Sequence, residues 1–152
     1  MELVPVAAID RGELTYENFK NEASALSQDK AKARAEEELK ALISYDIMKS
    51  DKHYNKELVD AMLDYMSDIL SAKRTFKNGN TEYSTAAMGN AFYRLNSIAV
   101  QYVVDKFTDV SREQKIKNKR SYLLRMLLTA PSDMETDVHA TVSYDMAHWD
   151  GE

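Results

Sequence analysis

Residues that break helices are scarce in this sequence, with four glycines and two prolines among 152 residues. A β-sandwich needs a turn signal about every ten residues, so this scarcity excludes a loop-rich all-β fold. It also leaves no room for a glycine-rich phosphate loop, and neither the dinucleotide-binding nor the P-loop spacing occurs. The chain has no cysteine, which excludes disulfides, thiolate zinc sites and cysteine nucleophiles. Helices are therefore expected to build most of the fold.

Apolar residues recur at helical spacing along most of the chain. Good N-cap residues precede several of these segments, among them Thr15, Asn55, Ser84 and Asn96. We expect helices over 16–26, 29–50, 56–73, 84–95, a segment starting at 96, 111–130 and 132–149. Between two of them, Asn78-Gly79 separates two short β-prone runs and predicts a hairpin at about 74–83. Gly89, inside a predicted helix, is expected to permit close packing.

The pattern predicts a mainly α fold: a compact helical bundle of about six to seven helices with one small β-hairpin. We divide the chain into an irregular lead-in with a short helix (1–35) and a helical domain (36–152), which together form a single globular unit. The apolar stripe on the 56–73 helix is wide enough for a central core helix, and it would also serve a homodimer. No apolar run approaches the roughly 18 residues of a membrane span, and no signal peptide is evident. We expect a cytoplasmic protein without membrane contact.

Four stretches carry a resemblance to a known family: ISYDIM (43–48), KELVDAMLDYMSDILSAKR (56–74), KNKRSYLLRMLLTAP (117–131) and SYDM (143–146). Over about 36–149 the chain resembles the C-terminal domain of replication initiator protein A homologues, found on plasmids and integrative elements of Gram-positive bacteria. That resemblance implies a helical replication-restart-like domain that touches single-stranded DNA and recruits a helicase loader or primase. The family's winged-helix region has no counterpart here, so we expect no origin recognition. The chain is then either an excised domain or a module that a mobile element uses alone, and the lead-in favours the stand-alone module.

A basic segment is the main candidate for nucleic-acid binding. Between residues 111 and 125, six basic side chains stand against the single Glu113, a balance of +5. Clustered Lys and Arg displace counterions from phosphates, and neighbouring tyrosines stack on unpaired bases. The candidate residues are Arg112, Lys115, Lys117, Lys119, Arg120 and Arg125, extended by Lys73, Arg74 and Lys77 near the hairpin. Tyr83, Tyr93, Tyr102 and Tyr122 are the candidate stacking residues. The alternative is an amphipathic helix with core tyrosines, or one neutralised by the acidic segment 131–152.

Asp60, Asp64 and Asp68 form an acidic stripe at four-residue steps on the 56–73 helix. Like charges at this spacing slightly destabilise a helix, so the stripe is a candidate surface for a basic protein partner. It would also suit imitation of DNA phosphates, although a plain solvated face explains it equally. Trp149, near the end of the chain, is a second candidate for partner contact.

The residue inventory supports no enzyme. The serines lack a nucleophile-elbow spacing. His139 and His148 are too far apart along one helix, about 13 Å, to share a metal ion, so no cofactor or metal is expected. The leading hypothesis is a non-enzymatic binding module of a mobile genetic element, acting in replication or other DNA transactions through a protein partner and weak single-stranded DNA binding. The alternative is a small inhibitor of a host nuclease, of the anti-CRISPR type with Cas9 as target.

Overall fold

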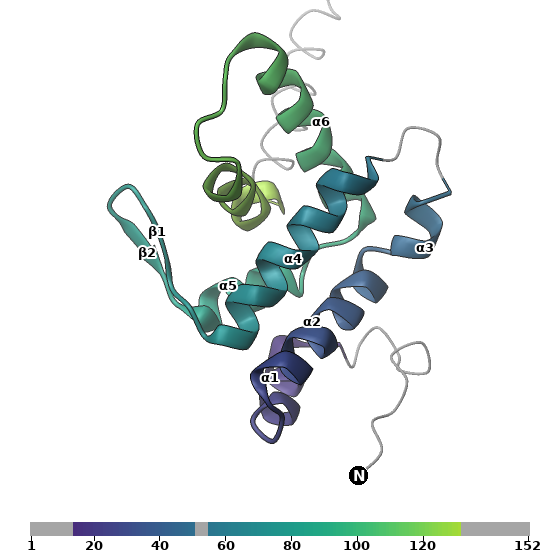
Figure 1. Ribbon diagram of the computed structural model, residues 1–152, viewed down its shortest axis with the longest axis vertical. Helices are drawn as coiled ribbons and strands as arrows, with labels where there is room; N and C mark the ends of the chain where they lie inside the picture. Colours follow the sequence, from purple (N-terminus) through teal and green to yellow (C-terminus); the bar gives the residue numbers. More distant parts are fainter. Residues whose placement is uncertain (1–13, 51–54, 132–152) are drawn as a thin grey trace, which may run out of the picture.

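The computed structural model describes residues 14–50 and 55–131 of the chain. Its elements in order are α1 (Tyr16–Ala23), α2 (Gln28–Leu42), α3 (Tyr45–Met48), α4 (Lys56–Ala72), β1 (Phe76–Asn78), β2 (Thr81–Tyr83), α5 (Thr85–Phe92) and α6 (Ser97–Glu113). A further helix covers 119–131 and is yellow-green in Figure 1. The predicted mainly α fold with one small hairpin is confirmed.

Side-chain caps determine where most of these helices begin. An oxygen of each cap residue accepts a hydrogen bond from the backbone N–H three residues later, which satisfies a donor that has no partner inside the helix. The four predicted caps are confirmed, at α1, α4, α5 and α6. Helix α2 begins one residue before the predicted Asp29, because Ser27 caps it. The predicted division between residues 35 and 36 falls inside α2, and Ala35 and Leu39 on either side of it are both fully buried.

Helix α4 runs through the centre of the fold and contacts α2, α5 and α6 (Figure 1). Its predicted apolar stripe is buried along the whole helix, except for Tyr65, which is half-buried. The opposing core side chains include Leu39 of α2, Phe92 of α5 and Val103 of α6. One chain therefore uses the whole stripe in its own core, so the stripe gives no reason to expect a homodimer.

The predicted single helix over 29–50 is wrong at its C-terminal end. Helix α2 ends at Leu42, and Ser44 takes the left-handed conformation with φ 57° and ψ 49° before α3 begins. This conformation costs about 1–2 kcal/mol in a residue with a Cβ, so helix propensity does not favour it. The break lets Ile43 and Met48 both pack in the core, while Ile47 is 73% exposed. Tertiary packing therefore determines where the helix breaks between α2 and α3.

The predicted hairpin is confirmed, but its turn lies one residue further along than Asn78-Gly79. Asn78 pairs with Thr81, which leaves Gly79 and Asn80 as the two loop residues. Gly79 has φ 63° and Asn80 does not have a positive φ, as in a type II′ turn with glycine in the first position. Phe76 is buried and stacks on Tyr83 across the ladder, with 6.3 Å between ring centres. Through this pair the hairpin packs on the helices.

Aromatic packing fixes α1 against α5. Tyr16 and Phe19 are buried, and both rings lie about 6 Å from the ring of Tyr93. Gly89 on α5 lies directly under the ring of Tyr16, and a Cβ at this position would approach Cγ of Tyr16 to 2.6 Å. The predicted close packing at Gly89 is confirmed.

A buried polar network lies beneath this aromatic cluster. Arg34 Nε donates to Glu38 Oε2 over 2.5 Å, and Tyr93 donates its hydroxyl hydrogen to Glu38 Oε1 over 3.1 Å. A second guanidinium nitrogen of Arg34 lies 3.2 Å from the carboxylate of Glu22. Burial raises the pKa of Glu38, while the bonds from Arg34 and Tyr93 favour its charged form and oppose the rise. Burial, with the adjacent Glu38 carboxylate, also raises the pKa of Tyr93. The network therefore couples α1, α2 and the end of α5.

Among the described helices none has the length and apolar character needed to cross a membrane. The expected lead-in at 1–13 and the expected closing helix at 132–149 lie outside the described residues.

Candidate nucleic-acid interface

The basic segment is not one helix, so the predicted helix over 111–130 is wrong. Residues 111–113 are the last turn of α6, and Gln114 is extended, with φ −152° and ψ 156°. A new helix begins at 119, where the side chain of Asn118 accepts a hydrogen bond from the backbone N–H of Ser121 over 3.0 Å. Asparagine is among the best N-cap residues, and this was the sequence signal for the break. Residues 114–118 therefore form a loop between two helices.

This loop forms one wall of a surface groove of about 300 Å³. The hairpin reaches the same groove through Asn78, and the first turns of the 119–131 helix form the rest of it. In Figure 1 the hairpin and this loop project on the same side of the molecule. The lining residues are Asn78, Gln114, Lys115, Ile116, Lys117, Asn118, Ser121, Tyr122 and Arg125. They include three cationic side chains, and none of the described lining residues is acidic.

The structure divides the nine predicted basic residues into groups. Lys115, Lys117 and Arg125 line the groove, and Lys77 and Lys119 are chain neighbours of its lining residues Asn78 and Asn118. The three lysines at 115, 117 and 119 are exposed, and within the described chain none of them makes an ion pair. Among the described residues no carboxylate therefore neutralises their positive charge.

The other predicted basic residues lie elsewhere or have acidic partners. Arg74 and Arg120 both approach Asp68 Oδ2, at 3.5 and 3.8 Å. Arg112 lies 3.8 Å from Asp109 and lines a different hollow beside α6. Lys73 is the C-cap residue of α4, with φ 54°. These four do not line the groove.

Of the predicted stacking tyrosines, Tyr122 is the one placed in the groove wall. Its ring is half-buried, packs edge-on against Phe107 at 5.9 Å, and carries the Arg125 guanidinium at 5.1 Å from its centre. Tyr93 is buried in the core and Tyr83 stacks on Phe76. Tyr102, on α6, is half-buried and has Lys106 over its ring.

The acidic stripe is paired within the molecule. Asp60 accepts hydrogen bonds from Tyr45 and Lys56, at 2.7 and 2.9 Å. Burial acts to raise the pKa of Asp60, but these two bonds outweigh it and lower the pKa below its usual value. Asp64 accepts from Lys32 over 2.7 Å, and that hydrogen bond raises the pKa of Lys32.

With Asp68 held beside Arg74 and Arg120, every member of the stripe has a cationic partner from this chain. These partners come from α2, from α4 itself, from the segment that follows α4 and from the 119–131 helix. Cations of the same chain therefore offset the like-charge repulsion that the four-residue spacing creates.

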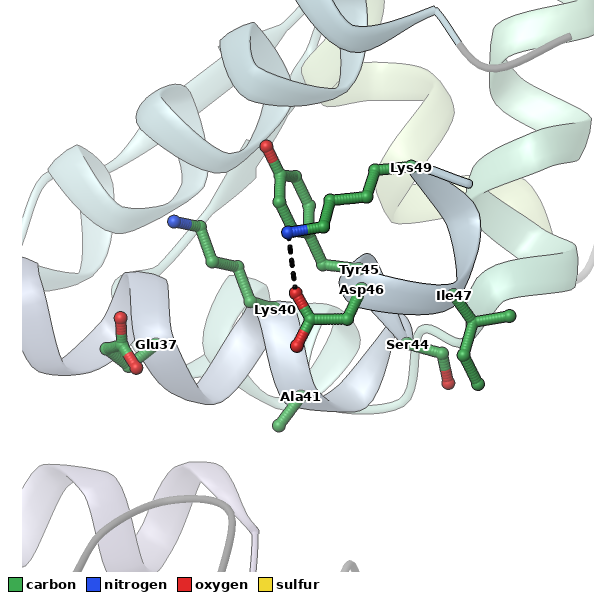
Figure 2. Close-up of a pocket in the computed structure, with 8 residues that line it drawn as sticks. All are labelled: Glu37, Lys40, Ala41, Ser44, Tyr45, Asp46, Ile47 and Lys49. Atoms are coloured by element: carbon green, nitrogen blue, oxygen red, sulfur yellow. Dashed lines mark ion pairs between the residues drawn. The ribbon is translucent and has the colours of Figure 1, made fainter. Parts of the chain in front are cut away.

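A second hollow, of about 480 Å³, lies at the corner between α2 and α3 (Figure 2). The ring of Tyr45 lies between Lys40 and Lys49, whose ammonium nitrogens are 5.1 and 5.9 Å from its centre. Lys49 also pairs with Asp46 at 3.2 Å, while the exposed Ile47 points away from both lysines. Cations and carboxylates are mixed in this hollow, so it lacks the single-sign charge of the groove. None of these residues was predicted as a site from the sequence.

Trp149, the second candidate for partner contact, lies outside the described residues. The same is true of His139, His148 and the acidic residues of the segment 132–152. Within residues 14–50 and 55–131, no three His, Asp or Glu side chains gather closely enough to hold a metal ion.

Comparison with curated proteins and with solved structures finds no match to this chain. A family model does match, over residues 17–149, from the second residue of α1 through the helix that contributes to the groove and beyond. This match covers most of the chain, and the protein therefore belongs to the family of unknown function DUF6017.

Proposed function

We propose that the protein is a non-enzymatic binding module that contacts single-stranded nucleic acid through the groove between the hairpin and residues 114–125. The main support for this proposal is the lining of the groove. It contains three cations, four uncharged hydrogen-bonding side chains and one aromatic ring, and none of its described lining residues is a carboxylate. Cations neutralise phosphates, and an aromatic or guanidinium surface stacks on unpaired bases. The chain has a net charge of −5, so binding depends on this local patch and not on overall charge.

The wider setting of the proposal is replication of a mobile genetic element, together with a helicase loader or primase. Its support is the sequence resemblance, and two stretches that carry this resemblance contribute to hollows on the surface. KNKRSYLLRMLLTAP (117–131) contributes to the basic groove, and ISYDIM (43–48) forms the corner between α2 and α3. The nuclease-inhibitor alternative rested on the missing winged-helix region and on an acidic stripe open to a partner. Because that stripe has partners within the chain, the binding module is the better-supported function.

Charge reversal in the groove tests the nucleic-acid proposal. We expect the double variant Lys115→Glu/Lys117→Glu to bind a single-stranded oligonucleotide of about 20 nucleotides at least tenfold more weakly than the parent protein. Each lost phosphate contact reduces the log–log salt slope by about 0.7 for a single strand, so two lost contacts reduce it by about 1.4. Fluorescence anisotropy titrations between about 50 and about 200 mM salt measure both quantities.

The matched control is Lys20→Glu/Lys30→Glu, which makes the same change in net charge on exposed positions of α1 and α2, away from the groove. We expect this variant to retain most of the affinity and the full salt slope. If both double variants lose affinity equally, binding follows net charge and the groove is not the interface. If the parent protein binds no single strand at any of these salt concentrations, the proposed function is wrong.

A further inference from the structure

The groove wall carries a pair of side chains, Tyr122 and Arg125, that simple phosphate binding does not need. Phe107 of α6 packs edge-on against the ring of Tyr122, and the guanidinium of Arg125 lies over that ring. Arg125 is exposed and lines the groove. A guanidinium held against an aromatic ring has a flat, cationic surface that it can offer to a ligand.

We infer that this face is a platform for a single unpaired nucleobase. The inference rests on the proposed function and adds to it a base-binding position, with Arg125 in contact with the base and Tyr122 as its positioning residue. Guanidinium planes and aromatic rings are the surfaces on which proteins stack splayed bases. A cluster of cations alone would bind the backbone and leave each base in solvent.

The other lining residues fit the edge of a base better than they fit a phosphate. Asn78, Gln114 and Ser121 are uncharged and offer both hydrogen-bond donors and acceptors. Asn118 uses its side-chain oxygen to cap the 119–131 helix, which leaves its NH₂ group as a donor toward the groove that it lines. A volume of about 300 Å³ is at the lower end of the range for small-molecule pockets, so the groove suits one nucleotide at a time.

This geometry also favours single strands over duplexes. In a duplex both faces of each base are covered by its stacked neighbours, so no face is available to Arg125. An unpaired base presents its face at little cost. Lys115 and Lys117, on the loop beside the stack, are then placed to neutralise the phosphates of the same strand.

An oligonucleotide without bases separates base stacking from phosphate binding. The probes are a thymidine oligonucleotide of about 20 nucleotides and an abasic oligonucleotide of the same length, which has the same phosphates and no bases. We expect the full chain to bind the thymidine oligonucleotide about tenfold more tightly, because one base–platform stack is worth about that factor. Arg125→Lys keeps the positive charge and loses the planar guanidinium, so its preference is expected to fall to about threefold or less.

Two controls define the result. Tyr122→Phe keeps the ring under Arg125 and should retain the preference, while Arg94→Lys makes the same chemical change at an exposed residue outside the groove and should retain it too. Equal affinity of the parent protein for both oligonucleotides would overturn the base platform and leave the groove as a phosphate-binding surface. An unchanged preference in Arg125→Lys would also overturn it. Binding of neither oligonucleotide would overturn the platform and the proposed function together.

Discussion

Glu38→Ala is expected to lower the free energy of unfolding by about 3–5 kcal/mol. Glu38 and Arg34 are both nearly inaccessible, with 3% and 7% of their side chains exposed. Removal of the carboxylate takes a close ion-pair contact from the Arg34 guanidinium, which stays in the interior beside the half-exposed Glu22. It also removes the acceptor of the buried Tyr93 hydroxyl. Removing one partner of a buried ion pair has a cost of this size because the other charge stays desolvated. Thermal unfolding followed by circular dichroism should show a fall in Tm of about 10 °C or more.

The control for this prediction removes the whole network. Arg34→Met/Glu38→Leu/Tyr93→Phe replaces every buried polar partner by an apolar side chain of similar size. Such replacements are often neutral or stabilising, because the desolvation cost of the ions disappears together with their attraction. We expect this triple variant to be much more stable than Glu38→Ala. If the triple variant unfolds as easily as Glu38→Ala, the ion pair itself stabilises the fold, and the explanation from an unpaired buried charge is incorrect.

Gly89→Ala is expected to destabilise the protein by about 1–3 kcal/mol, although alanine is the better helix former by about 1 kcal/mol. The new methyl group would enter the space of the Tyr16 ring, whose Cγ lies 2.6 Å from the ideal Cβ position. Tyr16 cannot yield easily, because it is buried and packs against Phe19 and Tyr93. Urea denaturation at constant slope should show the midpoint moving to lower denaturant concentration.

A second substitution tests whether the Tyr16 ring is the cause. In a Tyr16→Leu background the ring is absent, so the added methyl group meets a smaller and more adaptable side chain. Gly89→Ala should then cost less than it does in the parent protein, and a double-mutant cycle measures the difference. Equal costs in the two backgrounds would show that the Tyr16 contact does not explain the need for glycine. In that case the effect would come from elsewhere on α5.

Local sequence signals predicted the boundaries of several elements. Thr15, Asn55, Ser84 and Asn96 each cap the helix that they were expected to cap, because a cap depends on residues within one turn. The apolar stripe of α4 predicted its central position for a similar reason, since spacing alone defines a helix face. Asn118 carried the same kind of signal, and the basic run around it was nevertheless predicted as part of a continuous helix.

The candidate site was predicted in part. The sequence identified the cations at 115, 117 and 125 and the aromatic residue Tyr122, because clustered charge is visible in a linear chain. It gave no way to divide the nine basic residues between a groove and a set of internal ion pairs. That division depends on which carboxylates lie nearby, as Asp68 lies near Arg74 and Arg120. The buried pair of Arg34 and Glu38 was missed for a similar reason, since an i, i+4 pair on a charged helix looks the same whether it is exposed or buried.

The sequence by itself therefore determined the helical fold, the hairpin and most helix starts, because caps, turns and hydrophobic spacing act over a few residues. The tertiary structure decided the rest, since burial and pairing depend on segments that are distant in the chain. The left-handed Ser44 occurs because Ile43 and Met48 both pack in the core. The acidic stripe on α4 is tolerated because α2 and the 119–131 helix bring cations to it. The groove exists because the hairpin and a loop more than thirty residues later meet at one surface.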